Sequence, residues 1–128
     1  MGRTTVDDLL SAARARLVRL TPGEALAAVR DGAVLVDIRS EVQRATEGVV
    51  PQAVHVPRNT LEWRLDPESG ASNPLLARPE AQVIVMCDEG YQSSLAAAVL
   101  QDLGFTRATD LIGGFRAWKS SGLPVASQ

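Results

Sequence analysis

The chain has 128 residues, enough for one domain with a sizeable core that needs no disulfide or metal to hold it together. Its net charge of −2, with 45% hydrophobic and 22% charged residues, is typical of a globular protein and gives no reason to expect binding to nucleic acid or to a membrane surface. A single cysteine excludes an internal disulfide, and with only one histidine it argues against a zinc site, so we predict no metal and no cofactor.

The N-terminal residues are predicted to form a short amphipathic helix that braces the domain. Thr5 is a hydroxyl cap with acids in the turn after it, and apolar residues recur at helical spacing as far as Leu17. We expect residues 1–16 to be a helical extension of a single domain that spans residues 1–128. No apolar run reaches the length of about 20 residues that crosses a bilayer. No signal-peptide core is present either, so we predict a cytoplasmic protein.

The middle of the chain alternates between helical and strand patterns. Residues 17–20 are a candidate edge strand, and Thr21-Pro-Gly-Glu24 has the cap, proline and acid that begin a helix. Residues 33–38 form a near-continuous apolar run, which is typical of a strand covered on both faces. Further along we expect a polar helix, a short strand and another helix, at residues 39–47, 53–56 and 59–65.

The only cysteine lies at the end of a predicted strand. The apolar run 82–86 leads directly into Cys87, a loop containing Gly90 follows, and an Ala/Leu-rich helix then extends to Gly104. A last strand over 108–112 and a short helix complete the chain. This alternation predicts a parallel sheet with helices on both faces. Ligands bind such sheets at the carboxyl ends of the strands, where Cys87 would also meet the N-terminus of a helix.

Four segments, in order along the chain, resemble those of the single-domain rhodaneses, a family of sulfurtransferase domains. Val36-Asp-Ile-Arg39 resembles the family's Asp-x-Arg strand end, and residues 48–57 resemble its Gly-His-Ile-Pro-Gly-Ala segment. Residues 87–93 resemble the active loop, and residues 113–125 resemble the C-terminal signature. The resemblance implies a three-layer α/β rhodanese-like fold with a central, mostly parallel sheet of about five strands.

The resemblance also implies an activity. The protein would move a sulfane sulfur from thiosulfate or a persulfide to a thiol or cyanide acceptor, through a persulfide on the nucleophile Cys87. The substrate would be bound by the side chains and backbone of the loop, namely Asp88, Glu89, Gly90, Tyr91, Gln92 and Ser93. Partners would be these small molecules or a protein acceptor, and we expect a monomer or weak dimer.

The loop has an unusual balance of charge for this chemistry. A free thiol has a pKa of about 8.5, which helix N-termini and cations lower to about 3.5–7.5. Asp88 and Glu89 oppose such a shift, so we expect the loop N–H groups to face the sulfur and the acidic side chains to point outward. The family's usual arginine in this loop is replaced by Gln92, which leaves the donor open between thiosulfate and a persulfide.

Other side chains complete the predicted site. Cations for an anionic donor would come from Arg44, Arg58 or Arg64, although surface arginines are often only solvated. Asp37 and Arg39 are expected to form a structural pair, and Cys87 is expected to be an exposed, reactive thiol. We assign His55 a packed, non-catalytic role, place Tyr91 at the crest of the loop, and expect Trp63 and Trp118 in the core or in the pocket wall.

Two other functions on this fold deserve comparison. The related dual-specificity phosphatases need an arginine six positions after the cysteine, where this chain has Ser93, so phosphatase and arsenate reductase activities are disfavoured. The second alternative is a non-catalytic binding, regulatory or redox-sensing module. An exposed thiol of low pKa can sense oxidants as readily as it transfers sulfur.

Overall fold

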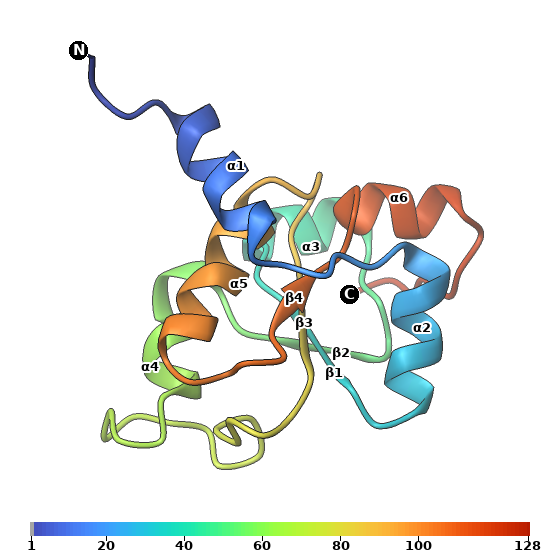
Figure 1. Ribbon diagram of the computed structural model, residues 1–128. Helices are drawn as coiled ribbons and strands as arrows, with labels where there is room; N and C mark the ends of the chain where they lie inside the picture. Colours follow the sequence, from blue (N-terminus) through green and yellow to red (C-terminus); the bar gives the residue numbers. More distant parts are fainter. Residues whose placement is uncertain (1) are drawn as a thin grey trace.

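A computed structural model describes residues 2–128, and its centre is a four-stranded sheet in which every strand is parallel to its neighbours (Figure 1). The strands lie in the order β2-β1-β3-β4, and their bounds are Val34–Asp37 for β1, Ala53–His55 for β2, Val83–Met86 for β3 and Thr109–Asp110 for β4. Asp37, at the end of β1, pairs with Met86 at the end of β3. The two apolar runs therefore form the centre of the sheet, as predicted for strands covered on both faces.

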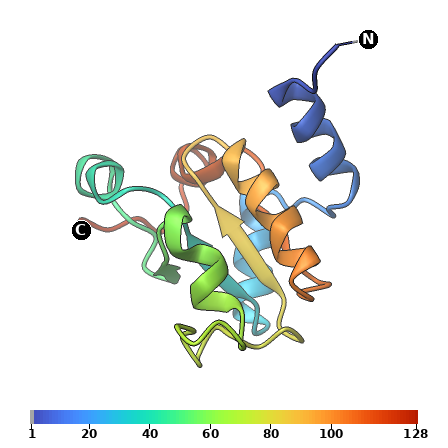
Figure 2. The same cartoon turned by 90° about the vertical axis from the view of Figure 1, so that its left-hand side faces the viewer.

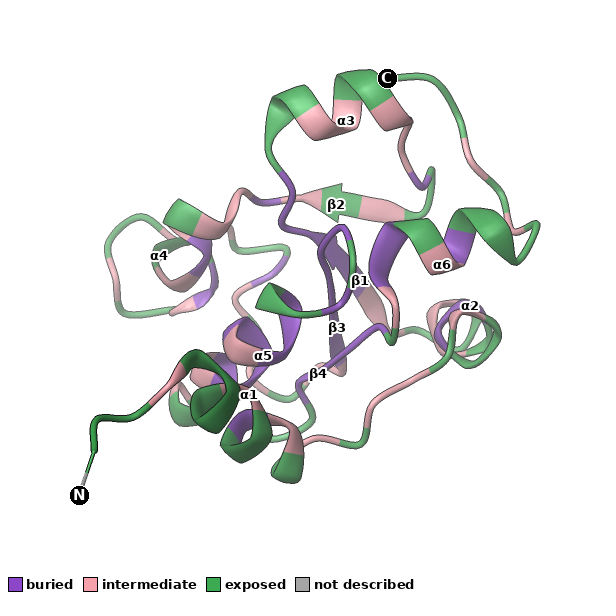
Figure 3. Cartoon of the chain, turned by 90° about the horizontal axis from the view of Figure 1, so that it is seen from above, coloured by how far each residue is buried: buried purple, intermediate pink, exposed green. Residues whose placement is uncertain are grey.

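Helices cover both faces and give the predicted three-layer α/β fold. One face carries α1 (Val6–Ala15), α4 (Leu61–Leu65) and α5 (Gln92–Asp102), and the other carries α2 (Pro22–Arg30) and α6 (Gly114–Ser120) (Figures 1 and 2). The remaining α-helix, α3 (Glu41–Glu47), follows the end of β1 and is mostly exposed, like α1 (Figure 3). Helices α1, α2 and α3 each begin with a capping box, at Thr5, Thr21 and Ser40.

The core is divided by the sheet into two clusters. The α5 side holds Leu61, Leu65 and Leu100, whereas the α2 and α6 side holds Phe115 and Trp118. Burial of a large aromatic side chain removes about 150–250 Å² from water, so Trp118 is a main contributor to the second cluster. Its indole N–H is satisfied by the Pro124 carbonyl at 2.8 Å.

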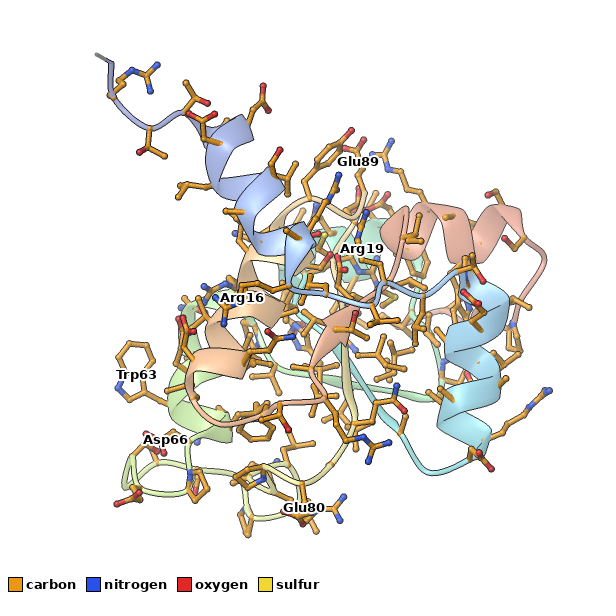
Figure 4. All side chains as sticks on the ribbon, in the orientation of Figure 1. Arg16, Arg19, Trp63, Asp66, Glu80 and Glu89 are labelled. Atoms are coloured by element: carbon orange, nitrogen blue, oxygen red, sulfur yellow. The ribbon has the colours of Figure 1, made fainter. Side chains whose placement is uncertain are left out.

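The placement of Trp63 in the core or pocket wall is wrong. Helix α4 has a single buried stripe, formed by Leu61 and Leu65 at i and i+4, and Trp63 therefore lies on its opposite face. The Trp63 side chain is 57% exposed and projects outward from α4 (Figure 4).

The edge strand expected over residues 17–20 is reduced to a single parallel bridge between Leu20 and Leu111. The Leu20 N–H donates to the Asp110 carbonyl at 3.1 Å, and the Ile112 N–H donates to the Leu20 carbonyl at 2.8 Å. A second bridge, antiparallel, joins Val49 to Ala126 near the C-terminus. Among residues 2–128 no helix has the length and apolar character required to cross a bilayer.

Candidate active site

Cys87 directly follows β3, at the point in the sheet where the chain order reverses. From β1 the chain proceeds to β2 on one side, whereas from β3 it proceeds to β4 on the other. Crevices form at the carboxyl ends of strands at such switch points. Here a pocket of about 580 Å³ lies between the residues after β1, the turn after β2 and the loop that begins at Cys87. Its walls include Ile38, Glu41, Pro57, Arg58, Tyr91 and Gln92.

The sulfur of Cys87 accepts two backbone hydrogen bonds from its own loop. The Gly90 N–H lies 3.2 Å and the Ser93 N–H 3.3 Å from Sγ. The residue is only 7% exposed, so the expectation of an exposed thiol is wrong. The loop wraps around the sulfur, and Cys87 reaches solvent where it lines the pocket.

The loop owes its shape to close contact with the start of α6. Gly90 has a φ of +88°, and a Cβ on it would lie 2.7 Å from the Gly113 nitrogen. The Cys87 carbonyl accepts from the Phe115 N–H at 2.8 Å, and the Asp88 carbonyl accepts from the Arg116 N–H at 3.1 Å. In a trans peptide the N–H points away from the C=O, so the N–H groups that follow these carbonyls point away from α6.

Several loop N–H groups are left for a ligand. Within residues 2–128, the N–H groups of Asp88, Glu89 and Tyr91 have no acceptor. Backbone donors gathered in a turn form an anion-binding nest that does not depend on side-chain charge. The loop can therefore stabilise a negative charge on or next to Sγ.

The two acids of the loop are placed differently from each other. Glu89 is exposed on the rim of the pocket, as expected of an outward side chain. Asp88 is buried, and its Oδ2 accepts from the Arg116 Nε at 2.8 Å. Gln92 and Tyr91 are exposed and line the pocket, and the Tyr91 side chain is 60% exposed at the crest of the loop.

Glu47 lies beside the Asp88 carboxylate. Hydrogen bonding to Asp88, together with burial and charge repulsion, raises the pKa of the Glu47 carboxyl above its usual value. Oδ1 of Asp88 is buried and receives no hydrogen bond from residues 2–128. The two carboxyls and the Arg116 guanidinium form a small charged cluster behind the loop.

A buried carboxylate supports the loop from below. Asp110 is fully buried, and its Oδ2 accepts from the hydroxyls of Ser93 and Ser94, both at 2.7 Å. Arg19 donates to both oxygens of the same carboxylate, at 2.8 and 3.2 Å. This arrangement satisfies the charge that burial would otherwise make costly.

Two arginines reach the loop from outside the predicted site. Nη2 of Arg14, on α1, donates to the Gly90 carbonyl at 2.7 Å, and Nη2 of Arg19 donates to the same oxygen at 3.0 Å. Sequence reasoning missed both residues, and it missed the roles of Ser94 and Asp110. Arg14 and Gly90 are 76 positions apart, and no local motif links them.

The arginines that were predicted as anion ligands lie in three different settings. Arg58 lines the pocket and is paired with Glu62 at 2.7 Å. Arg44 is directed toward Asp37 and Glu41, at 3.4 Å from each. Arg64 is exposed and donates to the Ala71 carbonyl. Of the three, only Arg58 lines the pocket that holds Cys87.

Asp37 and Arg39 form a buried pair at the end of β1. Arg39 donates to both Asp37 oxygens, at 3.1 and 2.9 Å, and its guanidinium lies 3.9 Å over the Phe115 ring. The ring nitrogens of His55 contact the Arg39 carbonyl at 2.7 Å and the Glu41 carboxylate at 3.0 Å. These side chains fix the segment after β1, which forms one wall of the pocket.

Comparison with known proteins gives consistent matches. The family model described as "Rhodanese-like domain" matches residues 21–121. A thiosulfate sulfurtransferase GlpE from Pseudomonas entomophila is 36% identical over 103 residues, which cover 80% of this chain and 85% of that protein. A sulfurtransferase from Allochromatium vinosum is 30% identical over 94 residues, covering 73% of this chain and 78% of that protein.

One of two similar solved structures extends the likeness to the N-terminal helix. A protein of unknown function from Rhodopseudomonas palustris, described as a possible tyrosine phosphatase, has a TM-score of 0.87 at 30% identity and covers 98% of each chain. A human single-domain sulfurtransferase has a TM-score of 0.68 at 27% identity, covering 80% of this chain and 95% of that chain. The first likeness includes α1, which lies outside the residues that match the family model.

Proposed function

Because the chain belongs to the rhodanese-like domain family, we propose that it is a sulfurtransferase that holds a sulfane sulfur as a persulfide on Cys87. The observation that carries this proposal is the position of Sγ, which accepts the Gly90 and Ser93 N–H groups and lines the pocket. Sulfur transfer needs a thiolate nucleophile, and hydrogen bonds from N–H groups favour the thiolate over the thiol.

The reaction proceeds in two displacements. In the first, the Cys87 thiolate attacks the outer sulfur of thiosulfate, the S–S bond of the donor breaks, and sulfite leaves with the electron pair. With a persulfide donor the leaving group is a thiolate. In the second, cyanide or an acceptor thiolate attacks the outer sulfur of the Cys87 persulfide, which releases thiocyanate or a new persulfide and restores the thiolate. No external oxidant or reductant is needed.

The free N–H groups of the loop would bind the sulfur that is transferred. The persulfide carries its charge on the outer sulfur, one bond beyond Sγ. The N–H groups of Asp88, Glu89 and Tyr91 belong to the same turn and have no protein acceptor within residues 2–128. Donors already held in place where charge develops stabilise it without reorganisation.

The walls of the pocket bear on the choice of donor. Glu41 and Glu89 lie on the rim. Among residues 2–128, the pocket wall has one cation besides the buried Arg39, namely Arg58, which Glu62 already neutralises. A dianion such as thiosulfate gains little from such a rim, whereas a persulfide of lower charge loses little. Thiosulfate remains the first donor to test, because the GlpE relatives are named thiosulfate sulfurtransferases. The acceptor would be a thiol or cyanide. A cytoplasmic location stays a prediction.

The phosphatase description of the Rhodopseudomonas palustris protein is not carried over. The sixth position after Cys87 is Ser93, and its N–H donates to Sγ. Arg14 and Arg19 contact the loop through the Gly90 carbonyl and do not line the pocket. A phosphate in the loop would therefore lack the bidentate arginine that clamps it in such enzymes.

Intact-mass spectrometry tests the proposal directly. The protein is incubated with thiosulfate, or with a low-molecular-weight persulfide, and we expect a mass gain of one sulfur atom that a reducing thiol or cyanide removes. Cys87→Ser is the control and should gain nothing. If no donor adds sulfur to the wild-type protein, the sulfurtransferase proposal fails, and the alternative of a regulatory or redox-sensing module takes its place.

A further inference from the structure

We propose that Arg14 and Arg19 are positioning residues of the active loop, which hold the Gly90 carbonyl outward and so turn the Tyr91 N–H to the opposite side of the loop, the side of the pocket that holds Cys87. This inference rests on the proposed function only in taking sulfur as the transferred atom. The effect of the two arginines on the reactivity of the Cys87 thiol does not depend on that function and can be measured separately.

The geometry of one peptide group carries the argument. The Gly90 oxygen accepts from Arg14 at 2.7 Å and from Arg19 at 3.0 Å, and the Ser94 hydroxyl lies farther away at 3.5 Å, so the two guanidinium groups are its nearest donors. The Gly90–Tyr91 peptide is trans, and its N–H therefore points away from both guanidiniums. The pocket is lined by Cys87 and Tyr91 and by neither arginine, so it lies on the other side of the loop.

Both guanidiniums are themselves held in place. Arg19 is fixed by its double contact with the buried Asp110, and Arg14 Nε donates to the Ser94 hydroxyl at 3.1 Å. Ser94 in turn donates to Asp110, so one buried carboxylate anchors both arginines. The Arg14 guanidinium also lies 5.5 Å from the centre of the Tyr91 ring. A group that orients another must be immobile, and this network provides that.

Charge adds to orientation. Two cations on the Gly90 carbonyl polarise its peptide group, which makes the Tyr91 N–H a stronger donor. They also supply positive charge to a loop that carries Gln92, Asp88 and Glu89. The charge therefore comes from behind the loop, where it leaves the pocket free. Arg14 reaches the Gly90 carbonyl from α1, which packs beside α5 (Figure 2).

The helix α1 offers a matched control for the test. Arg16 directly follows α1, but it pairs with Asp102 at the end of α5 and lies away from the loop that carries Glu89 (Figure 4). We would compare Arg14→Met, Arg14→Lys and Arg16→Met with the wild type. Because Cys87 is the only thiol, its alkylation by iodoacetamide at neutral pH reports on the loop alone. The second measurement is kcat and KM for sulfur transfer from thiosulfate to cyanide.

We expect Arg14→Met to lower both the alkylation rate and kcat by about five- to tenfold, with KM unchanged within about twofold, because a hydrogen bond to a charged donor is lost. Arg14→Lys should recover most of the loss, since an ammonium group can still donate to the Gly90 oxygen. Arg16→Met should match the wild type. Arg14→Gln replaces Arg14→Met if that variant does not fold.

Two results would overturn the proposal. One is an alkylation rate for folded Arg14→Met equal to that of Arg16→Met. The other is a loss in Arg14→Lys as large as in Arg14→Met, which would mean that α1 packing, and not donation to the carbonyl, is what matters. If the wild-type protein transfers no sulfur, the proposed function fails, while the alkylation comparison still decides the role of Arg14.

Discussion

Gly114 packs directly under Cys87, and a Cβ on Gly114 would lie 2.5 Å from the Cys87 carbonyl oxygen. Gly114 also has a φ of +62°, which side chains other than hydrogen adopt at a cost. We therefore expect Gly114→Ala to destabilise the protein by about 2–4 kcal/mol and to displace the loop. Urea unfolding measures the first effect, and alkylation of Cys87 measures the second.

Gly122 is the control for that substitution. It has a φ of +77°, but a Cβ there would meet no atom of the described residues, 2–128, within 4 Å. Gly122→Ala should cost about 1 kcal/mol, from the left-handed conformation alone, and should leave the alkylation rate unchanged. Equal destabilisation of the two variants would show that the contact between Gly114 and the loop is not tight in solution.

Gln92→Arg should make thiosulfate a better substrate. Gln92 is exposed and lines the pocket, so an arginine there places a cation at the mouth of the nest. One new charge-assisted contact to the dianion is worth about 1–2 kcal/mol, which corresponds to roughly a tenfold gain in kcat/KM. Steady-state rates with thiosulfate and cyanide measure this gain.

Gln52→Arg, which adds the same charge at an exposed position outside the pocket, should have no effect. An unchanged rate for Gln92→Arg would mean that charge at this position does not limit the donor.

Glu47→Gln should stabilise the protein near neutral pH. A carboxyl whose pKa is raised on folding is ionised at a cost above that raised pKa, and the cost disappears as the pH falls toward the usual value of 4.5. The variant removes the cost, so we expect a rise in Tm of about 2 °C at neutral pH, and convergence with the wild type as the pH approaches that value. Thermal unfolding followed by circular dichroism across this range checks the sign. Glu80→Gln, at an exposed position, should show no such pH dependence. If the Tm of Glu47→Gln stayed above that of the wild type at low pH, repulsion between the Glu47 and Asp88 carboxylates would not be the cause of the gain.

Asp110→Asn should lower the free energy of unfolding more than Asp102→Asn, which makes the same chemical change at the surface. Asp110 is buried and holds Ser93, Ser94 and Arg19, so a neutral amide leaves the Arg19 charge without its partner, at a cost of about 2–4 kcal/mol. Asp102→Asn breaks the exposed pair with Arg16 and should cost less than about 1 kcal/mol. Urea unfolding of both variants gives the comparison. Similar costs would indicate that the buried network contributes little beyond a surface pair.

Much of the fold follows from the sequence, because its strong signals are local. The apolar runs before Asp37 and Cys87 predict strands covered on both faces, and in the structure these runs form β1 and β3. The caps at Thr5 and Thr21 begin the helices they predicted. The alternation of helices and strands led to the parallel three-layer sheet.

The parts that could not be predicted depend on contacts between distant segments. The anchor of Arg14 and Arg19 on Gly90 appears only when α1 packs against α5. The burial of Cys87 and Asp88 depends on the contact between their loop and the start of α6, which no local pattern contains. Trp63 was misplaced because a five-residue helix is too short for a hydrophobic pattern to identify its buried face.

The shortness of the outer strands has a consequence for how copies of this chain meet. A free strand edge is a template for pairing with another chain, and long edges lead to aggregation. β4 has two residues, and Leu20 already occupies its outer side through the hydrogen bonds with Asp110 and Ile112. β2 has three residues. The sheet therefore presents little backbone for extension, so an encounter between two copies would have to be stabilised by side chains, and the most exposed site for unwanted strand addition is β2.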